Sequence, residues 1–247
     1  HSLLKLTKDN RGYGVAIHEE FRVPEPGIPE RLDGPSQVEQ FIRAIPHIKY
    51  RIALYRERRN REIEFEQLLI RANNCEHESN SDFFIVDRQV SMPGDVGQLD
   101  LLAIYWKAEH RKRNQVVPLE LIEVKFGLNN DIYKVCDQLR RYYCYVRGNI
   151  EEAAEGAERL LKQKIDLGLF DQPQNRLDAM RTLKISRRVE DLRCGVVLVD
   201  YNPNSTLLDG NKWVIEAMPQ PVDVFRAGLG LWVCGCSAQT PLPNTTV

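Results

Sequence analysis

The stretch LDLLAIYW (residues 99–106), followed by VVPLELIEVKF (residues 116–126), decides the fold of this chain. Both segments are apolar and rich in branched and aromatic side chains, which is typical of buried strands. The segment between them, KAEHRKRNQ (residues 107–115), is charged and turn-like. We therefore predict two neighbouring strands joined as a hairpin.

Ionisable residues interrupt both predicted strands. Because side chains alternate between the two faces of a strand, Glu123 and Lys125 share one face of the second strand. If the strands pair, Asp100 in the first strand comes within a few ångströms of Glu123. Two carboxylates this close repel each other unless a cation neutralises them, and their hard oxygen atoms favour Mg²⁺, for which Mn²⁺ can substitute.

These residues predict a hydrolytic site. The metal would stabilise charge on a phosphodiester, and Lys125 would orient or deprotonate one of the waters that Mg²⁺ retains. Asp95 is another acid nearby, but it lies beside Gly94 in a predicted loop, where Asp commonly serves turn geometry, so we prefer Asp100. The alternative is an exposed ion pair with no catalytic role.

The spacing of Asp100 and Glu123-x-Lys125 resembles the signature of the PD-(D/E)XK nuclease superfamily. Gln138 and Tyr142 follow on a predicted helix, four residues apart and thus on one helical face. Such a Gln-x-x-x-Tyr helix after the Glu-x-Lys strand resembles the RecB-like and lambda-exonuclease-like branch. The resemblance covers roughly residues 59–145, and it departs from the pattern where Leu99 stands in place of a Pro before the Asp.

The resemblance implies a fold and a set of roles. The fold would be an α/β, restriction-endonuclease-like core, with a central mixed β-sheet flanked by α-helices. Asp100, Glu123 and the carbonyl of Val124 would be metal ligands, and Lys125 would orient the attacking water. Gln138 and Tyr142 would hold the nucleophile or the scissile phosphate.

A helix before the first core strand carries a further candidate acid. Its apolar stripe is predicted to be Phe65, Leu68, Leu69 and Ala72, by the spacing of three and four residues. Glu62 lies nearest that stripe and resembles the superfamily's additional metal-site Glu, with Glu66 at the edge of the stripe as the alternative. A third reading is that the glutamates of this helix pair with neighbouring arginines.

Basic residues gather around the predicted acidic centre although the net charge is only −1. Such clusters can lead a phosphate backbone towards a metal, whereas the net charge argues against a wholesale nucleic-acid coat. The alternative is that they solvate helix surfaces. The predicted nucleic-acid contacts are Arg59, Arg61, Arg111, Lys112, Arg113, Arg140 and Arg141.

The remaining sequence predicts two parts. Residues 1–35 are expected to form an N-terminal β-hairpin around residues 11–14, followed by a Pro-rich connection (PEPGIPERLDGP, residues 24–35). Residues 36–247 would form the nuclease-like domain, which begins with a helix at Ser36. Further strands are expected at 82–90, 194–200, 212–218 and 230–233, and further helices at 151–167 and 175–183.

Composition sets the expected setting. With 43% hydrophobic and 28% charged residues, and no apolar run of about 20 residues, we expect a cytoplasmic protein without a membrane span. The six Cys lack paired spacing and are expected to be free thiols. The chain begins with His1 rather than Met. We therefore expect that upstream residues are missing, and that the protein has additional domains or subunits.

The sequence thus predicts a Mg²⁺-dependent nuclease that hydrolyses DNA phosphodiester bonds, single- or double-stranded. One alternative is a catalytically silent nucleic-acid-binding module of the same fold. Another is a nuclease that acts on RNA, because a site that reads phosphate is indifferent to the 2′-hydroxyl unless a residue probes it.

Overall fold

The structure is a computed structural model that describes residues 4–10, 12–18, 22, 27–55, 61–76, 78, 80–127, 134–202, 218 and 220–227. The chain divides into two compact units, residues 1–60 and residues 61–247. Each is described by itself. Within these described residues, no helix has the length and apolar character needed to cross a membrane.

The first unit is a small antiparallel sheet with one helix. Strands β1 (Leu4–Asp9) and β2 (Gly12–Ile17) form the predicted hairpin, and β3 (Arg31–Leu32) pairs with β2. Helix α1 (Pro35–Tyr55) buries Ala44 and Ile48 against Ile17 and Ile28. Because this contact holds α1 to the hairpin, the helix belongs to the first unit, whereas the sequence placed the boundary at residue 35.

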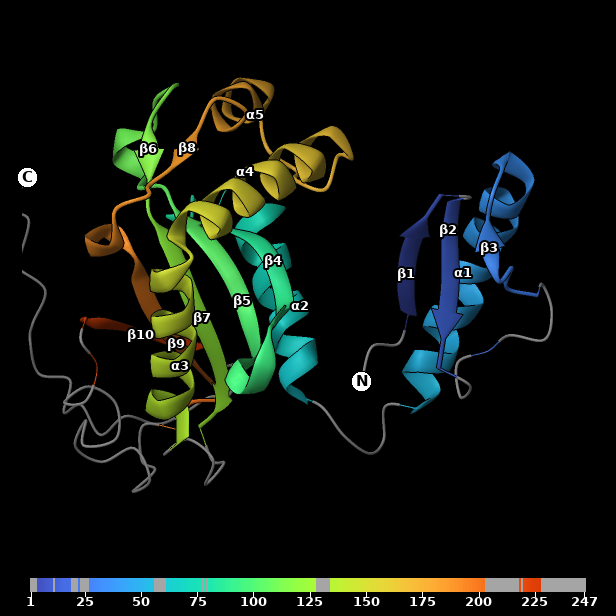
Figure 1. Cartoon of the computed structure of the whole chain (residues 1–247), viewed down its shortest axis with the longest axis horizontal. Helices are drawn as coiled ribbons and strands as arrows, with labels where there is room; N and C mark the ends of the chain where they lie inside the picture. Colours follow the sequence, from blue (N-terminus) through green and yellow to red (C-terminus); the bar gives the residue numbers. More distant parts are fainter. Residues whose placement is uncertain are drawn as a thin grey trace, which may run out of the picture. The chain divides into compact units, whose positions relative to one another are not determined.

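The second unit is built on a five-stranded mixed sheet with the order β10-β9-β7-β5-β4. As Figure 1 shows, β4 (Phe83–Met92), β5 (Gly97–Tyr105) and β7 (Leu119–Phe126) form an antiparallel meander. Strand β9 (Arg193–Val199) lies parallel to β7, and β10 (Val222–Ala227) lies parallel to β9. The predicted hairpin of the two deciding segments is therefore confirmed, as is the α/β class.

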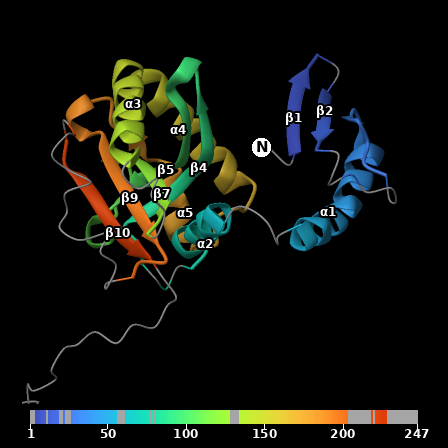
Figure 2. The same ribbon diagram turned by 90° about the horizontal axis from the view of Figure 1, so that it is seen from below.

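Helices cover both faces of this sheet (Figure 2). Helix α2 (Arg61–Asn74) packs Phe65 and Leu69 on the face that carries Leu101 and Ile122. Helices α3 (Val135–Gly148) and α4 (Ile150–Asp166) cover the other face, where the main core lies, and the short α5 (Gln174–Met180) follows. The alternation of β7 side chains between the two cores is the period of two that the sequence displays.

Short elements complete the unit. They are the 3-10 helices η3 (Gly94–Val96), η4 (Ala108–His110) and η6 (Val189–Asp191), and a two-stranded parallel ladder of β6 (Val116–Val117) with β8 (Lys184–Ile185). The first two residues of the second deciding segment thus leave the main sheet. Helix α4 ends as predicted before Gly168, whose φ of 66° suits a residue without a side chain.

Two of the predicted strands, 212–218 and 230–233, fall on residues outside the described part, except for Met218. Strand β10 was not predicted. Its residues VDVFRA give a weak strand signal, because the alternation of apolar and polar residues breaks at the consecutive Val224 and Phe225. Of the six Cys, the four in described segments, Cys75, Cys136, Cys144 and Cys194, are free thiols.

A buried asparagine joins α2 to the edge strand β4. Asn74, at the end of α2, donates from Nδ2 to the carbonyl of Ile85 (2.9 Å), and its Oδ1 accepts the Ile85 N–H (2.8 Å). The Asn74 carbonyl in turn accepts from Gln172 Nε2 (2.9 Å). Asn74 therefore pairs with Ile85 as a neighbouring strand would, next to the bulge between Ile85 and Asp87.

The Asn74→Ala variant should lower the free energy of unfolding by about 3 kcal/mol, because it leaves the buried N–H and carbonyl of Ile85 without these partners. Urea unfolding followed by circular dichroism measures this. The exposed Asn175, which bonds only locally at the start of α5, supplies the control Asn175→Ala. Equal stability of the two variants would contradict the proposed link between α2 and β4.

Candidate active site

The candidate site lies where strands β5 and β7 separate. Their backbone pairing ends at Leu101 opposite Ile122. Beyond that pair, the side chain of Asp100 takes over, since its Oδ2 accepts the backbone N–H of Val124 at 2.9 Å. The half-buried Asp100 carboxylate therefore fills the opening between the two strands and replaces one rung of the ladder.

Glu123 and Lys125 lie beside this opening on the same face of β7. Both side chains are buried, and Lys125 Nζ donates to Glu123 Oε1 at 2.6 Å. The sequence placed these two groups on one face and next to Asp100, and the structure brings the three together as predicted. The exposed ion pair that was the alternative is not what the structure contains, because the pair is only 2% exposed at Glu123 and 10% at Lys125.

A fourth group links Asp100 to helix α2. Gln89 of strand β4 donates from Nε2 to Glu66 Oε1 at 2.8 Å and to Asp100 Oδ1 at 3.3 Å. Glu66 is buried, and Arg88 lies 3.5 Å from its other oxygen. The site thus draws side chains from α2, β4, β5 and β7.

Burial shifts the protonation of these acids. It raises the pKa of Glu66 to about 7, with the nearby Asp100 charge adding to the effect and Gln89 and Arg88 opposing it. Burial also raises the pKa of Asp100, against the opposing Val124 N–H and the Lys125 charge. Acids that resist ionisation when no cation is bound are typical of sites that receive one.

The predicted Gln-Tyr pair lies on α3. Tyr142 is buried, and its hydroxyl donates to the carbonyl of Gln98 at 2.8 Å, two residues before Asp100. Burial, together with the charges of Glu123 and Asp100, raises the pKa of Tyr142 to about 12, so the hydroxyl lies within the electrostatic reach of these acids. Gln138 is half-buried one turn earlier, and no polar contact of its side chain ties it to the acids.

Glu66 is the helix acid that the described side chains place at the site. Glu62 also lies in α2, but its side chain falls outside the described part of the chain. The predicted stripe included Leu68, which is 49% exposed, whereas Phe65, Leu69 and Ile70 make the actual contact with the sheet. This rotation of the helix turns Glu66 inward, so the alternative that the sequence kept is the one that reaches Asp100.

The donor set suits a hard cation with few protein ligands. In the segments that the structure describes, no three His, Cys, Asp or Glu side chains are arranged closely enough to hold a metal ion. Asp100 and Glu123 nevertheless offer carboxylate oxygens from adjacent strands, and Val124, whose carbonyl is the third predicted ligand, directly follows Glu123 in the chain. Mg²⁺ is held by one or two carboxylates and retains several waters, so these oxygens fit it.

Arg111, a predicted nucleic-acid contact, is used by the fold. Its guanidinium lies over the rings of Phe84 (5.0 Å) and Trp106 (5.3 Å) and donates to the carbonyls of Trp106 and Ser81 and to Asn80 Oδ1. Burial lowers its pKa to about 10. Trp106 follows strand β5 at the end opposite Asp100, about 20 Å away for six residues of extended chain.

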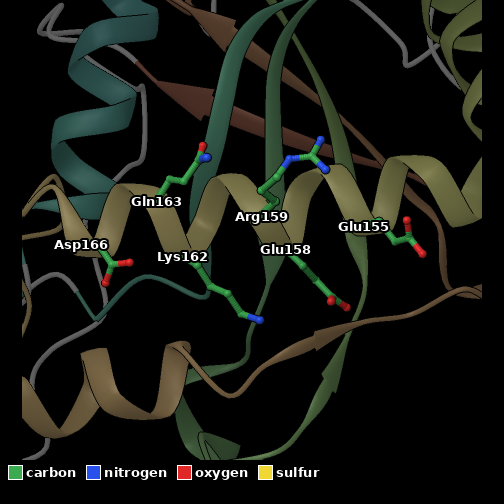
Figure 3. Close-up of a pocket in the computed structure, with 6 residues that line it drawn as sticks. All are labelled: Glu155, Glu158, Arg159, Lys162, Gln163 and Asp166. Carbon is green, nitrogen blue, oxygen red and sulfur yellow. The ribbon is translucent and has the colours of Figure 1, made fainter.

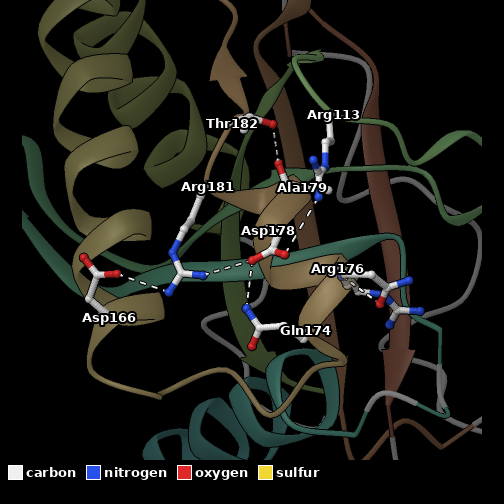
Figure 4. A network of polar contacts seen from close by, with 9 residues as sticks. Arg113, Asp166, Gln174, Arg176, Asp178, Ala179, Arg181 and Thr182 are labelled. Carbon is white, nitrogen blue, oxygen red and sulfur yellow. Dashed lines mark hydrogen bonds and ion pairs between the residues drawn. The ribbon is translucent and has the colours of Figure 1, made fainter.

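Arg113 and Lys112 lie in the same connection. Arg113 is 3.8 Å from Asp178 of α5, which also accepts from Gln174 and Arg181 (Figure 4). Lys112 is exposed. This basic segment follows the end of β5, whereas Asp100 lies towards the start of that strand. The segment is therefore at the opposite end of the hairpin from the acids.

The remaining predicted nucleic-acid contacts differ in their surroundings. Arg141 is exposed and its Nε lies 3.5 Å from the carbonyl of Val96, close to the start of β5 and thus to Asp100. Arg140 pairs with Asp137 at 3.1 Å on the surface of α3. Arg59 lies outside the described residues, and so does the side chain of Arg61.

A separate open cavity of about 370 Å³ lies along α4 (Figure 3). Its partly buried Glu158 accepts the Ile185 N–H (2.9 Å) and pairs with Arg187 and Lys184. These contacts fasten α4 to β8. None of the acids of the candidate site is among its lining residues, which are Glu155, Glu158, Arg159, Lys162, Gln163 and Asp166.

Sequence reasoning missed Gln89. The feature that distinguishes Gln89 is a backbone φ of 53° inside a strand. The amino-acid sequence does not reveal this conformation. Comparison with known proteins adds no relative: no protein-family model matches the chain, and neither does any curated protein or solved structure.

In the absence of divalent metal, the free energy of unfolding should fall as pH rises from about 4.5 to about 7 because of Glu66. The unfolded chain ionises this group near its ordinary pKa of 4.5, whereas the folded protein keeps it protonated up to about 7. The Glu66→Gln variant should remove a fall on the order of 2 kcal/mol. Urea unfolding at several pH values measures the slope.

The control for this prediction is Glu64→Gln, which removes the same charge from the same helix without touching Gln89 or Arg88. If both variants lose the same pH slope, the environment of Glu66 is not its cause.

The Arg111→Ala variant should lower the free energy of unfolding by about 2–3 kcal/mol, since it removes two ring contacts and charged hydrogen bonds. Lys112→Ala, its exposed neighbour, should change it by less than about 0.5 kcal/mol. Thermal and urea unfolding measure both. A stable Arg111→Ala protein with weakened DNA binding would instead restore the predicted role of Arg111 as a nucleic-acid contact.

Proposed function

We propose that this chain is a metal-dependent nuclease that hydrolyses DNA phosphodiester bonds on a restriction-endonuclease-like fold. One observation carries the proposal: Asp100 and the Glu123–Lys125 pair meet where strands β5 and β7 separate. The order of elements supports it, because α2, three antiparallel strands, α3 and then the parallel β9 give a mixed sheet flanked by helices. That is the layout that the PD-(D/E)XK resemblance implies.

In the proposed mechanism, Asp100, Glu123 and the carbonyl of Val124 would hold Mg²⁺, for which Mn²⁺ could substitute. When bound, the ion supplies charge neutralisation for the phosphodiester and acidifies water. The Val124 N–H fixes the orientation of the Asp100 carboxylate. Lys125, already held 2.6 Å from Glu123, orients the attacking water and stabilises the charge that develops on the phosphate.

Residues of α2 and α3 complete the proposed site. Glu66, which Gln89 links to Asp100, adds an acid as a ligand or as an outer base. Tyr142, whose hydroxyl lies within the electrostatic reach of the acids, and Gln138, one turn earlier, would contact the substrate phosphate or the nucleophile, as the RecB-like and lambda-exonuclease-like resemblance implies. Arg141 and Arg88 are the cations beside the acids that would attract the nucleic-acid backbone.

A catalytically silent nucleic-acid-binding module is the second candidate. One observation favours it: Lys125 already neutralises Glu123 at 2.6 Å, and no third acidic ligand completes a metal cluster among the described side chains. An RNA substrate would use the same phosphate chemistry, so matched RNA belongs in the same experiment.

The test is incubation of the protein with linear, circular and single-stranded DNA and with matched RNA, with and without Mg²⁺ or Mn²⁺. The wild type should cleave DNA only with metal. Asp100→Asn should reduce the rate about 10³-fold, because loss of a ligand removes several kcal/mol of transition-state stabilisation, and about 1.4 kcal/mol corresponds to a factor of ten.

Asp95→Asn is the matched control, since Asp95 is an exposed acid in η3 only five residues before Asp100. It should retain activity. Full activity of folded Asp100→Asn would sink the assignment of the site, and binding of DNA without any metal-dependent cleavage by the wild type would favour the silent module.

A further inference from the structure

Gln89 occupies an unusual place in the edge strand β4. Its side-chain amide is shared by two acids that come from different elements, Glu66 of α2 and Asp100 of β5. Its own carbonyl accepts from the side chain of Gln98 at 2.9 Å. Hydrogen bonds thus fix both the side-chain amide and the backbone carbonyl of Gln89.

The backbone of Gln89 is in the left-handed region, with φ 53°, although its neighbours Arg88 and Val90 stay in register with Leu101 and Leu99 of β5. L-residues with side chains rarely adopt this conformation within a strand. The left-handed turn at Gln89 lies on the same short segment as the bulge between Ile85 and Asp87. Bulges of this kind re-aim side chains near functional sites.

Two features of Gln89 are unfavourable by themselves, namely its left-handed backbone and the position of its amide between two carboxyl groups. A left-handed backbone is unfavourable for a residue with a side chain, and one neutral donor between two carboxylates brings like charges together. The two features share one result: the Gln89 amide bonds Asp100 Oδ1 while the Val124 N–H bonds Oδ2. Both oxygens are then oriented, and since a carboxylate has about four acceptor sites, each retains capacity for a cation.

We propose that Gln89 is a positioning residue that fixes the Asp100 and Glu66 carboxylates in the orientation that receives the divalent ion. This inference rests on the proposed function and deepens it, because it assigns the control of metal affinity and turnover to a neutral side chain on the edge strand. Gln89 itself touches neither substrate nor metal.

The experiment compares Gln89→Gly and Gln89→Asn with the wild type. Glycine removes the amide but suits φ 53°, so the protein should be at least as stable as the wild type. Asparagine tolerates the left-handed backbone but is one methylene too short to join both acids. In both variants kcat should fall about 10- to 100-fold, with KM for DNA nearly unchanged and about 10-fold more Mn²⁺ needed for half-maximal rate.

Ser91→Gly is the control, since it places a glycine at an exposed position of the same strand and should retain wild-type kcat and metal demand. Thermal unfolding of all variants accompanies the kinetics. The proposal is overturned if Gln89→Gly keeps wild-type kcat and metal demand, or if its loss of activity equals a loss of folded protein.

Calorimetric titration with Mn²⁺ separates this proposal from the proposed nuclease function. If the wild type cleaves no nucleic acid, the nuclease function fails, but about 10-fold weaker Mn²⁺ binding by Gln89→Gly than by the wild type still supports positioning. Equal Mn²⁺ affinity in the two proteins overturns it, and so does a wild type that binds no Mn²⁺.

Discussion

The hydrogen bond from the Val124 N–H to the Asp100 carboxylate is the interaction on which the site depends. A backbone N–H in the middle of a sheet needs a partner, and the neighbouring strand normally supplies a carbonyl. Here β5 and β7 stop pairing after Leu101 and Ile122, and a side chain takes the place of the carbonyl. The sheet thus opens without leaving this group unsatisfied, and a carboxylate is fixed in the opening.

Burial of a carboxylate in this opening disfavours its charged form, and nearby cations offset part of this effect. Asp100 and Glu66 both have raised pKa values because they are buried, and Glu123 is buried beside them. Lys125 offsets part of this charge at 2.6 Å from Glu123, and Arg88 lies 3.5 Å from Glu66. The Asp100 and Glu123 carboxylates share the cation of Lys125, so a further positive ion would be favoured between them, which is the physical basis of the proposed metal chemistry.

The local sequence pattern was sufficient to predict Asp100, Glu123 and Lys125, but not the residues of α2 that surround them. The period of two placed Glu123 and Lys125 on one face, and the apolar run around Asp100 distinguished it from the exposed Asp95. Which acids of α2 point inward depends on how the helix rotates against the sheet, and in the structure Leu68 is exposed whereas Glu66 is buried. No local pattern fixes that rotation, because tertiary packing decides it.

Gln89 and Arg111 were beyond sequence reasoning for related reasons. The left-handed φ of Gln89 occurs where its side-chain amide donates to Glu66 and its backbone carbonyl accepts from Gln98, and the residue type alone does not predict it. The basic residues of 107–115 predicted phosphate contacts by charge alone, whereas Arg111 stacks on Phe84 and Trp106 and closes the hairpin. Charge identifies a cation, but only burial shows whether the fold already uses it.

The two ends of the β5–β7 hairpin therefore carry opposite uses of charge. At the closed end, Arg111 and Arg113 bind carbonyls, aromatic rings and Asp178, so their charge contributes to stability. At the open end, Asp100 of β5 lies beside Glu123 of β7 where the backbone ladder is interrupted, and Gln89 links Asp100 to Glu66 of α2. Rigid pairing between Leu101–Ile104 and Leu119–Ile122 joins the two ends. Because the strand pairing at the closed end is rigid, the acids at the open end stay in place although they repel each other. A preorganised cation site requires this arrangement.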